Sequence, residues 1–201
     1  VLLQCNAKTI HSWGGIGLAN GEKLAVANKV NKSRFKKKNW KMVDLLIVDE
    51  VSMMSVKIFE LLEMTARLCR KNTKPFGGIQ VIFTGDFYQL PPVGNDGEPE
   101  TVKFCFESPI WKNIFTRQIQ LKQIFRQDDP IYKKILNQIR IGRITKSTVE
   151  TLNKYVGRKV GTGEKILPTV LYPTKRKVEA INTASLNGLK GDEFVFDFSM
   201  A

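Results

Sequence analysis

Two acidic turns that follow apolar runs carry the residues of this sequence best suited to catalysis. Asp49 and Glu50 close the run 43–50, and Gly85, Asp86 and Gln89 follow the run 78–84. Apolar runs of this kind are typical of parallel strands that are buried on both faces of a sheet. Ligands of open α/β sheets bind where such strands end. Two adjacent carboxylates and a nearby glutamine at that edge suit a magnesium nucleotide and an attacking water.

Each of these side chains has a distinct chemical use at such an edge. Asp49 can hold Mg²⁺ through its water shell, and Glu50 can orient and deprotonate a water. Gln89 can donate to a phosphate oxygen while accepting from a water, and Pro91 and Pro92 stiffen the loop behind it. The residues alone leave an alternative open, in which the acids only stabilise a helix N-terminus.

The elements that position these turns can be predicted from the apolar pattern. Apolar residues recur at helical spacing over residues 55–71, and Lys74–Gly78 breaks that helix before the second strand. A strand, helix and strand of this length predict a parallel crossover. A short strand is predicted over 119–121, and further helices are predicted over 129–141, from Ser147 onward, and over 174–187.

Composition narrows the class of protein. The chain has 201 residues, 42% of them hydrophobic, which allows one α/β domain or one domain and part of a second. A net charge of +13 favours a polyanionic partner such as nucleic acid. One histidine and three scattered cysteines argue against a histidine metal site and a disulfide framework. No apolar run reaches the roughly 20 residues of a membrane span, so no membrane partner is expected.

Five segments, whose order along the chain matches the order of the motifs, resemble parts of superfamily 1 helicases. Asp49–Met53 resembles motif II (Walker B), Gly85–Pro92 resembles motif III, and Leu121–Gln127 resembles motif IV. Thr9–Gly17 resembles motif Ia of the Pif1 group, and Ile139–Arg143 also matches a run of that group. The chain is therefore similar to Pif1-like helicases, of the Pif1/RecD branch of superfamily 1B, over about residues 5–190.

The resemblance implies an α/β fold, a RecA-like (P-loop NTPase) parallel sheet with flanking helices. Residues 1–116 would be RecA-like domain 1A without its Walker A portion, and residues 117–201 the N-terminal part of domain 2A. The sequence holds no Gly-x-x-x-x-Gly-Lys-Ser/Thr loop. We therefore expect a fragment that alone neither hydrolyses ATP efficiently nor unwinds DNA.

The same resemblance assigns roles at the nucleotide. It implies that ATP and Mg²⁺ are the cofactors, that Asp49 binds the metal, and that Glu50 is the catalytic base. Gln89 would contact the γ-phosphate, and Arg126 would act as an arginine finger, a role that suits a planar guanidinium. Without the motif context, a surface ion pair would be the preferred interpretation of Arg126.

The resemblance also implies contacts with single-stranded DNA. Thr9, His11 and Ser12 would lie on the strand, where short polar groups suit phosphates. Trp13, Phe87 and Tyr88 could stack on bases, although residues such as Trp13 and Phe87 belong more often to a core. The basic run from Lys29 to Lys41, which includes Phe35 and Trp40, is either a solvated face or a further DNA contact.

At the level of the whole protein, the resemblance predicts a 5′-to-3′ DNA helicase. Its partners would be single-stranded, forked or structured DNA, and it would be a monomer acting in replication, repair, recombination or telomere maintenance. It would be intracellular, and nuclear or mitochondrial in a eukaryote. Two other classes stay open: a non-catalytic nucleic-acid-binding module, and a P-loop ATPase that acts on RNA or protein.

Overall fold

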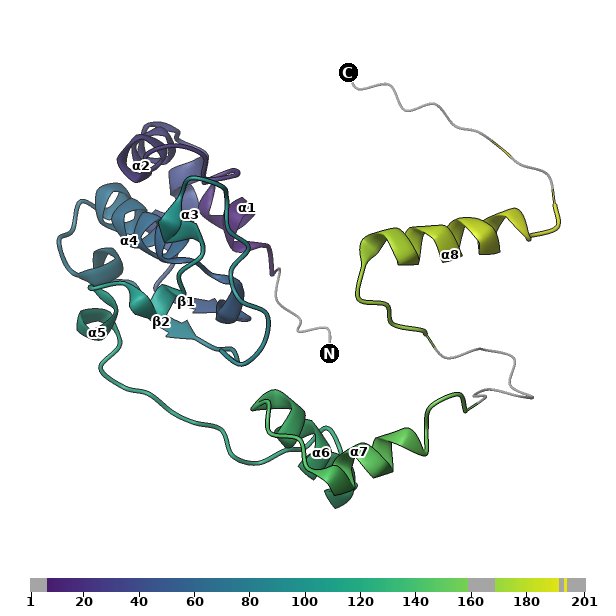
Figure 1. Ribbon diagram of the computed structural model, residues 1–201. Helices are drawn as coiled ribbons and strands as arrows, with labels where there is room; N and C mark the ends of the chain where they lie inside the picture. The colour runs from purple at the N-terminus through teal and green to yellow at the C-terminus, as the bar shows by residue number, and fades with distance from the viewer. Residues whose placement is uncertain (1–6, 159–168, 192–193, 195–201) are drawn as a thin grey trace. The chain divides into compact units, whose positions relative to one another are not determined.

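The computed structural model describes residues 7–158, 169–191 and 194 (Figure 1). By their internal contacts these residues belong to two compact units. The first unit lies within residues 1–145 and the second within residues 146–201. This division follows the contacts within each unit, and the RecA-like domain boundary expected at residue 116 stays a prediction.

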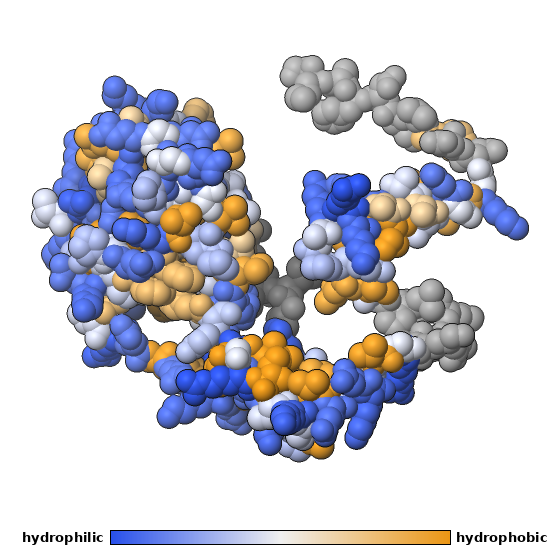
Figure 2. All heavy atoms as spheres, in the orientation of Figure 1, coloured by the Kyte–Doolittle hydropathy of each residue, from blue (hydrophilic) through white to orange (hydrophobic). Residues whose placement is uncertain are grey.

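The first unit holds most of the regular structure. Its helices and strands are α1 (Ile10–Gly14), α2 (Lys23–Lys32), α3 (Lys36–Met42), β1 (Leu45–Val48), α4 (Val56–Arg70), β2 (Gln80–Phe83), α5 (Trp111–Ile114) and α6 (Pro130–Arg140). Its short 3₁₀ turns are η1 (Val51–Met53), η2 (Pro75–Gly78), η3 (Pro99–Thr101) and η4 (Cys105–Glu107). In the orientation of Figure 2, hydrophilic side chains cover most of this unit's surface.

The two predicted strands form a parallel pair. β1 and β2 are neighbours, in register from Leu45 opposite Gln80 to Val48 opposite Phe83, and α4 lies between them in the chain. Their carboxyl ends therefore meet at one edge of the sheet, as the sequence predicts. This arrangement confirms the α/β class with a parallel sheet and flanking helices.

The prediction that both strands are buried on both faces is wrong for the described residues. Successive side chains of a strand point to opposite faces. Leu46 and Val48 belong to the core, whereas Leu45 and Ile47 on the other face of β1 are 44% and 60% exposed. Ile82, which pairs with Ile47, is 44% exposed as well. In the part of the chain described, one face of this sheet packs against the core, and the other is largely exposed.

Helix α4 is the centre of the core. The Ser55 hydroxyl caps its first turn by accepting a hydrogen bond from the Ile58 N–H, and Lys71 ends it in the left-handed conformation. Phe59, Leu61, Leu62 and Ala66 of this helix are fully buried. An aromatic cluster joins the helix to β2 and α5 through ring centroid distances of 4.3–6.2 Å: Phe59, Phe76, Phe83, Trp111 and Phe115.

Arg70, at the last turn of α4, fixes the entry into both strands. Its Nη1 donates to the carbonyls of Trp40 and Val43 at 3.0 and 2.9 Å, and its Nε donates to the carbonyl of Gly77 at 2.9 Å. Gly77 has a φ of +59°, and a Cβ there would lie 2.7 Å from the Ala66 carbonyl oxygen. Only glycine fits this approach, so the Pro75–Gly78 turn and Arg70 together set where β1 and β2 begin.

The described residues of the second unit form the helices α7 (Lys146–Asn153) and α8 (Lys175–Asn187). Both were predicted from the sequence. Among the helices of the described residues, none combines the length and the apolarity that a membrane span requires.

Candidate nucleotide and nucleic-acid site

The two acidic turns are in direct contact at the carboxyl edge of the sheet. The Val51 N–H donates to the Thr84 carbonyl at 3.2 Å, and the Thr84 N–H donates to the Val48 carbonyl at 2.9 Å. Gly85 lies so close to the first turn that a Cβ would stand 2.8 Å from the Val51 nitrogen. The turn that carries Asp49 and Glu50 is thus packed against the turn that leads to Gln89.

The first turn is strained and leaves its carboxylates open. Glu50 adopts φ 56° and ψ 45°, a left-handed conformation that costs a residue with a side chain about 1–2 kcal/mol. Asp49 Oδ1 accepts a hydrogen bond from the Glu50 N–H at 2.9 Å, which orients the aspartate. Both residues are exposed, and in the described part of the chain neither carboxylate has an ion-pair partner.

The second turn is held by the carboxylate of Asp86. It accepts hydrogen bonds from the Tyr88 N–H at 3.1 Å and from Gln89 Nε2 at 3.4 Å, while the Gln89 N–H donates to the Asp86 carbonyl at 2.8 Å. Asp86 thereby orients the backbone and side chain of Gln89. Gln89 itself is exposed at the edge of the sheet.

An arginine from α6 completes the second turn, and the sequence did not single it out for that role. Arg140 Nε donates to Asp86 Oδ2 at 2.7 Å and Nη2 donates to Oδ1 at 2.8 Å, a bidentate pair. The hydrogen bonds from Arg140 hold the pKa of Asp86 below its ordinary value, and the bonds to Asp86 raise the pKa of Arg140. The Arg140 guanidinium also lies over the Tyr88 ring, 4.8 Å from its centroid.

Phe87 and Tyr88, both proposed as base-stacking residues, lie in different surroundings. Phe87 is half-buried, and its ring packs edge-on against Phe104, Phe106 and Trp111. Tyr88 is 65% exposed, with Arg140 over its ring. Tyr88 therefore has the more accessible ring of the two.

The predicted DNA-contact segment coincides with α1. Thr9 caps this helix, because its hydroxyl accepts from the Ser12 N–H at 3.4 Å, and Thr9, His11 and Ser12 are exposed. Trp13 is half-buried and packs edge-on against the buried Trp40 of α3, with ring centroids 4.7 Å apart. The α1 region thus exposes small polar side chains to solvent, while Trp13 packs the helix against α3.

Arg126 lies apart from these contacts. It is exposed in the irregular segment between α5 and α6, and within the described residues no hydrogen bond or ion pair joins it to Asp49, Glu50 or Gln89. Its role as an arginine finger stays a prediction.

The donor set at the first turn fits Mg²⁺ bound together with a nucleotide. In the described chain no three His, Cys, Asp or Glu side chains gather as a metal cage. Mg²⁺ usually keeps several waters and takes one or two carboxylates plus substrate phosphates. An exposed, oriented Asp49 beside Glu50 supplies ligands of that kind.

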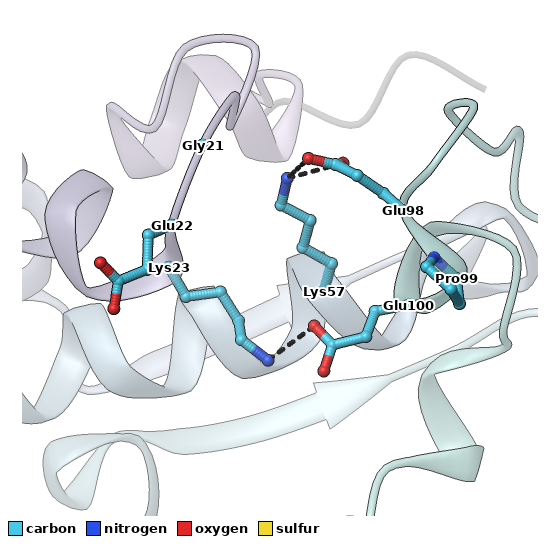
Figure 3. Close-up of a pocket in the computed structure, with 7 residues that line it drawn as sticks. All are labelled: Gly21, Glu22, Lys23, Lys57, Glu98, Pro99 and Glu100. Atoms are coloured by element: carbon cyan, nitrogen blue, oxygen red, sulfur yellow. Dashed lines mark hydrogen bonds and ion pairs between the residues drawn. The ribbon is translucent and has the colours of Figure 1, made fainter.

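A pocket lined in part by Lys23, Lys57, Glu98 and Glu100 lies at a different place in the first unit (Figure 3). Lys57 pairs with Glu98 at 2.8 Å, and Lys23 pairs with Glu60 and Glu100 at 2.6 and 2.8 Å. Both ammonium groups already have carboxylate partners. The lysines of this pocket therefore join α2 and α4 to the 98–100 loop and are not free to bind phosphate.

Comparison with known proteins identifies the family. The family model for PIF1-like helicases matches residues 1–150. The ATP-dependent DNA helicase RRM3 of Saccharomyces cerevisiae is 41% identical over 188 residues, which cover 94% of this chain and 26% of that protein. The chain thus spans about a quarter of the length of this relative.

Two solved structures are similar to the fold. The crystal structure of the Pif1 helicase of Candida albicans has a TM-score of 0.83 and 37% identity, over 92% of this chain and 41% of that one. The Bacteroides Pif1 helicase in complex with ADP-AlF3 and ssDNA has a TM-score of 0.71 and 30% identity, over 80% of this chain and 39% of that one. With this sheet, these turns and these matches, the chain belongs to the family of PIF1-like helicases.

Proposed function

We propose that this chain supplies the hydrolytic edge and part of the DNA-binding surface of an ATP-dependent DNA helicase. The observation that carries the proposal is the packing of Gly85 against Val51, which brings the Asp49–Glu50 turn beside the turn of Gln89. The residues that hydrolyse a nucleotide and the residue that senses its γ-phosphate must lie at the same edge of the sheet, because they act on the same phosphate group. The names of the matched proteins and the ADP-AlF3 bound in the Bacteroides structure support this assignment.

In this proposal the residues of the first turn hold the metal and prepare the water. Asp49 would hold Mg²⁺, which would supply charge neutralisation at the transferred phosphoryl group. Glu50, which follows Asp49 in a left-handed backbone conformation, accepts the proton of the attacking water. Arg126 adds a positive charge to the phosphates from the segment that precedes α6.

Gln89 acts as the sensor of the γ-phosphate in this proposal. Its amide can donate to a phosphate oxygen and accept from a water. The hydrogen bonds from Gln89 to Asp86 keep the side chain in a fixed turn before nucleotide binds. Such preorganisation lowers the cost of forming the contact.

The DNA-contact residues proposed are Thr9, His11, Ser12 and Trp13 of the α1 region, with Tyr88 and Phe87 as stacking candidates. The exposed hydroxyls and the histidine suit phosphate oxygens. The ssDNA in the Bacteroides complex supports a single strand as the ligand. Tyr88 is the better placed of the two aromatic rings because Phe87 is held by three aromatic neighbours.

The whole protein is proposed to move 5′ to 3′ on single-stranded DNA and to open forked or structured DNA as a monomer. It would act inside the cell, in the nucleus or mitochondria of a eukaryote, in replication, repair, recombination or telomere maintenance. The geometry of the described residues supports only the proposed nucleotide and DNA contacts. The proposed direction of movement, DNA substrates, monomeric state, location and cellular roles are supported by membership of the family.

The test is the ATPase rate of the whole protein with and without single-stranded DNA, for the wild type and Glu50→Gln. We expect DNA to stimulate hydrolysis strongly and the substitution to abolish it, since the amide cannot accept the proton. Asp44→Asn, at the amino end of the same strand, is the matched control and should hydrolyse ATP like the wild type.

Two results would contradict the proposal. Salt-sensitive DNA binding without any hydrolysis by the wild type would favour a non-catalytic nucleic-acid-binding module. Hydrolysis stimulated by RNA or by protein, but not by single-stranded DNA, would favour a P-loop ATPase of another kind.

A further inference from the structure

The basic residues near α2 and α3 differ from the lysines of the pocket in their partners. Lys23 and Lys57 each pair with carboxylates at 2.6–2.8 Å. Seven cations between α2 and the end of α3 make no ion pair with an acidic side chain in the described chain: Lys29, Lys32, Arg34, Lys36, Lys37, Lys38 and Lys41. These seven cations, here called the α2–α3 basic surface, are therefore free to bind an external anion.

The sequence keeps acids out of the α2–α3 basic surface. Glu22 and Asp44 flank it, and no aspartate or glutamate lies between them. Like charges at helical spacing repel and destabilise α3. Solubility alone does not require such a one-sign cluster, because mixed charges serve it equally well. The concentration of positive charge fits a polyanion that neutralises it on binding.

An aromatic ring lies in the middle of these cations. Phe35, which precedes α3, is 88% exposed. An exposed ring among lysines suits stacking on an unpaired base while neighbouring ammonium groups contact phosphates. Bases of a duplex are stacked on one another and do not offer a face to such a ring, so this combination points to a single strand.

The α2–α3 basic surface adjoins the α1 segment. Asn39 Nδ2 donates to the Trp13 carbonyl at 2.8 Å, and Trp40 Nε1 donates to the Gly14 carbonyl at 2.9 Å. The stem of Lys36 lies so near Gly15 that a Cβ there would be 2.9 Å from the Lys36 Cβ. Helix α3 is thus fixed directly against the helix that carries Thr9, His11 and Ser12.

We propose that the α2–α3 basic surface with Phe35 is a second contact surface for single-stranded nucleic acid, continuous with the α1 segment. The inference rests on the proposed DNA-binding function and extends it to residues outside the helicase-like motifs. The cations neutralise successive phosphates, and Phe35 stacks on a base between them.

The test measures binding of the full chain to a fluorescent oligothymidine, without nucleotide, as a function of salt. The variant K32Q/K38Q/K41Q removes three exposed charges of the surface. The control K74Q/K103Q/K112Q removes three exposed lysines elsewhere in the first unit, so both variants have the same net charge. Thermal unfolding of each variant checks that its fold is retained.

The two variants should differ clearly. Each phosphate contact to a single strand contributes about 0.7 to the slope of log affinity against log salt, so three lost contacts lower the slope by about 2. We expect an affinity loss of roughly tenfold or more near 0.1 M salt. The control should keep the wild-type slope. Equal effects of both variants would overturn the proposal, because they would reflect net charge alone.

Phe35→Ala tests the stacking step separately. It should weaken binding to oligothymidine about fivefold or more and leave binding to an abasic strand unchanged. The proposal would also be overturned if K32Q/K38Q/K41Q bound oligothymidine like the wild type but lost binding to duplex DNA or to anionic phospholipid vesicles. Because no hydrolysis is measured, failure here is distinct from failure of the ATPase assignment.

Discussion

The two turns at the carboxyl edge of the sheet differ in how their carboxylates are used. Asp49 and Glu50 make no ion pair in the described residues, and the aspartate accepts only a neighbouring backbone N–H. Asp86 accepts two bonds from Arg140 and two from its own turn. Asp49 and Asp86 follow similar strands. The carboxylate of Asp49 is available to a ligand, whereas the carboxylate oxygens of Asp86 already accept hydrogen bonds from protein donors.

This difference separates a chemical role from a positioning role. A carboxylate that is to hold a metal must keep its oxygens available. A carboxylate that fixes a turn works best when all its oxygens are bonded. The position of an acidic residue at a strand end therefore does not by itself assign its role. The hydrogen-bond partners of its carboxylate distinguish metal binding from positioning of the turn.

The largest expected effect comes from replacing each acid by its amide in the whole protein. Asp49→Asn should lower DNA-stimulated ATP turnover about 100-fold or more, because it weakens binding of a metal that contributes several kcal/mol at the transition state. Asp86→Asn should lower it less, since this carboxylate only orients Gln89. The measurement is the steady-state ATPase rate at saturating DNA over a range of Mg²⁺ concentrations.

The Mg²⁺ dependence distinguishes the two roles. The Asp49 variant should require more Mg²⁺ for its half-maximal rate, and the Asp86 variant should keep the wild-type requirement. The comparison between the turns would be wrong if both variants shifted the Mg²⁺ requirement equally.

The contact between the turns can be broken at Gly85. An alanine Cβ there would lie 2.8 Å from the Val51 nitrogen and 3.1 Å from its Cγ2, so the two turns must separate. We expect Gly85→Ala to destabilise the first unit by about 1–3 kcal/mol, the usual cost of overpacking. Urea unfolding followed by tryptophan fluorescence measures it, because Trp13, Trp40 and Trp111 all lie in this unit.

Gly97→Ala is the control for Gly85→Ala. Gly97 has a φ of +79° with open space around its missing side chain. Gly97→Ala should therefore lower the free energy of unfolding only by the backbone strain, about 1–2 kcal/mol, and leave ATP turnover unchanged. An equal loss of stability in Gly85→Ala and Gly97→Ala would show that backbone strain, and not the packing of the two turns, causes the effect of Gly85→Ala.

Local sequence patterns were enough to predict the strands, helix α4 and the meeting of the two turns. These features follow from apolar periodicity and from the break at Lys74–Gly78, which act within a few residues of the chain. Parallel pairing then places both strand ends at one edge.

Contacts between distant residues could not be predicted in this way. Arg140 lies 54 residues from Asp86, and nothing in the charge pattern distinguishes it from other arginines. Arg70 likewise shows its carbonyl partners only in three dimensions. The same limit applies to Phe87, whose aromatic neighbours come from the segment 104–111. The strand predicted over residues 119–121 is wrong, because these residues have no regular structure.

A smaller effect is expected at the ion pair that holds the second turn. Side chains of Arg140 and Asp86 are 41% and 24% exposed, so solvent screens their attraction. A double-mutant cycle of Asp86→Asn and Arg140→Gln should give a coupling free energy of about 1 kcal/mol or less in urea unfolding. The single variants should also raise the ATP concentration for half-maximal rate through a less ordered Gln89. Additive effects on unfolding would exclude a stabilising pair.

The stabilisation from the ion pair between Arg140 and Asp86 should not depend on pH between pH 5 and pH 7. The folded-state pKa of Asp86 lies below its ordinary value because Arg140 donates to the ionised form. The stabilisation is therefore complete above the unfolded-state pKa, about 3.9 for an aspartate, and is lost as the pH falls through the folded-state pKa. The difference in urea midpoint between wild type and Arg140→Gln should stay constant from pH 7 to 5 and shrink only below about pH 4. A difference that already disappears between pH 7 and 5 would mean that another group titrates at this contact, and the second turn would then lack the fixed carboxylate that sets it apart from the first.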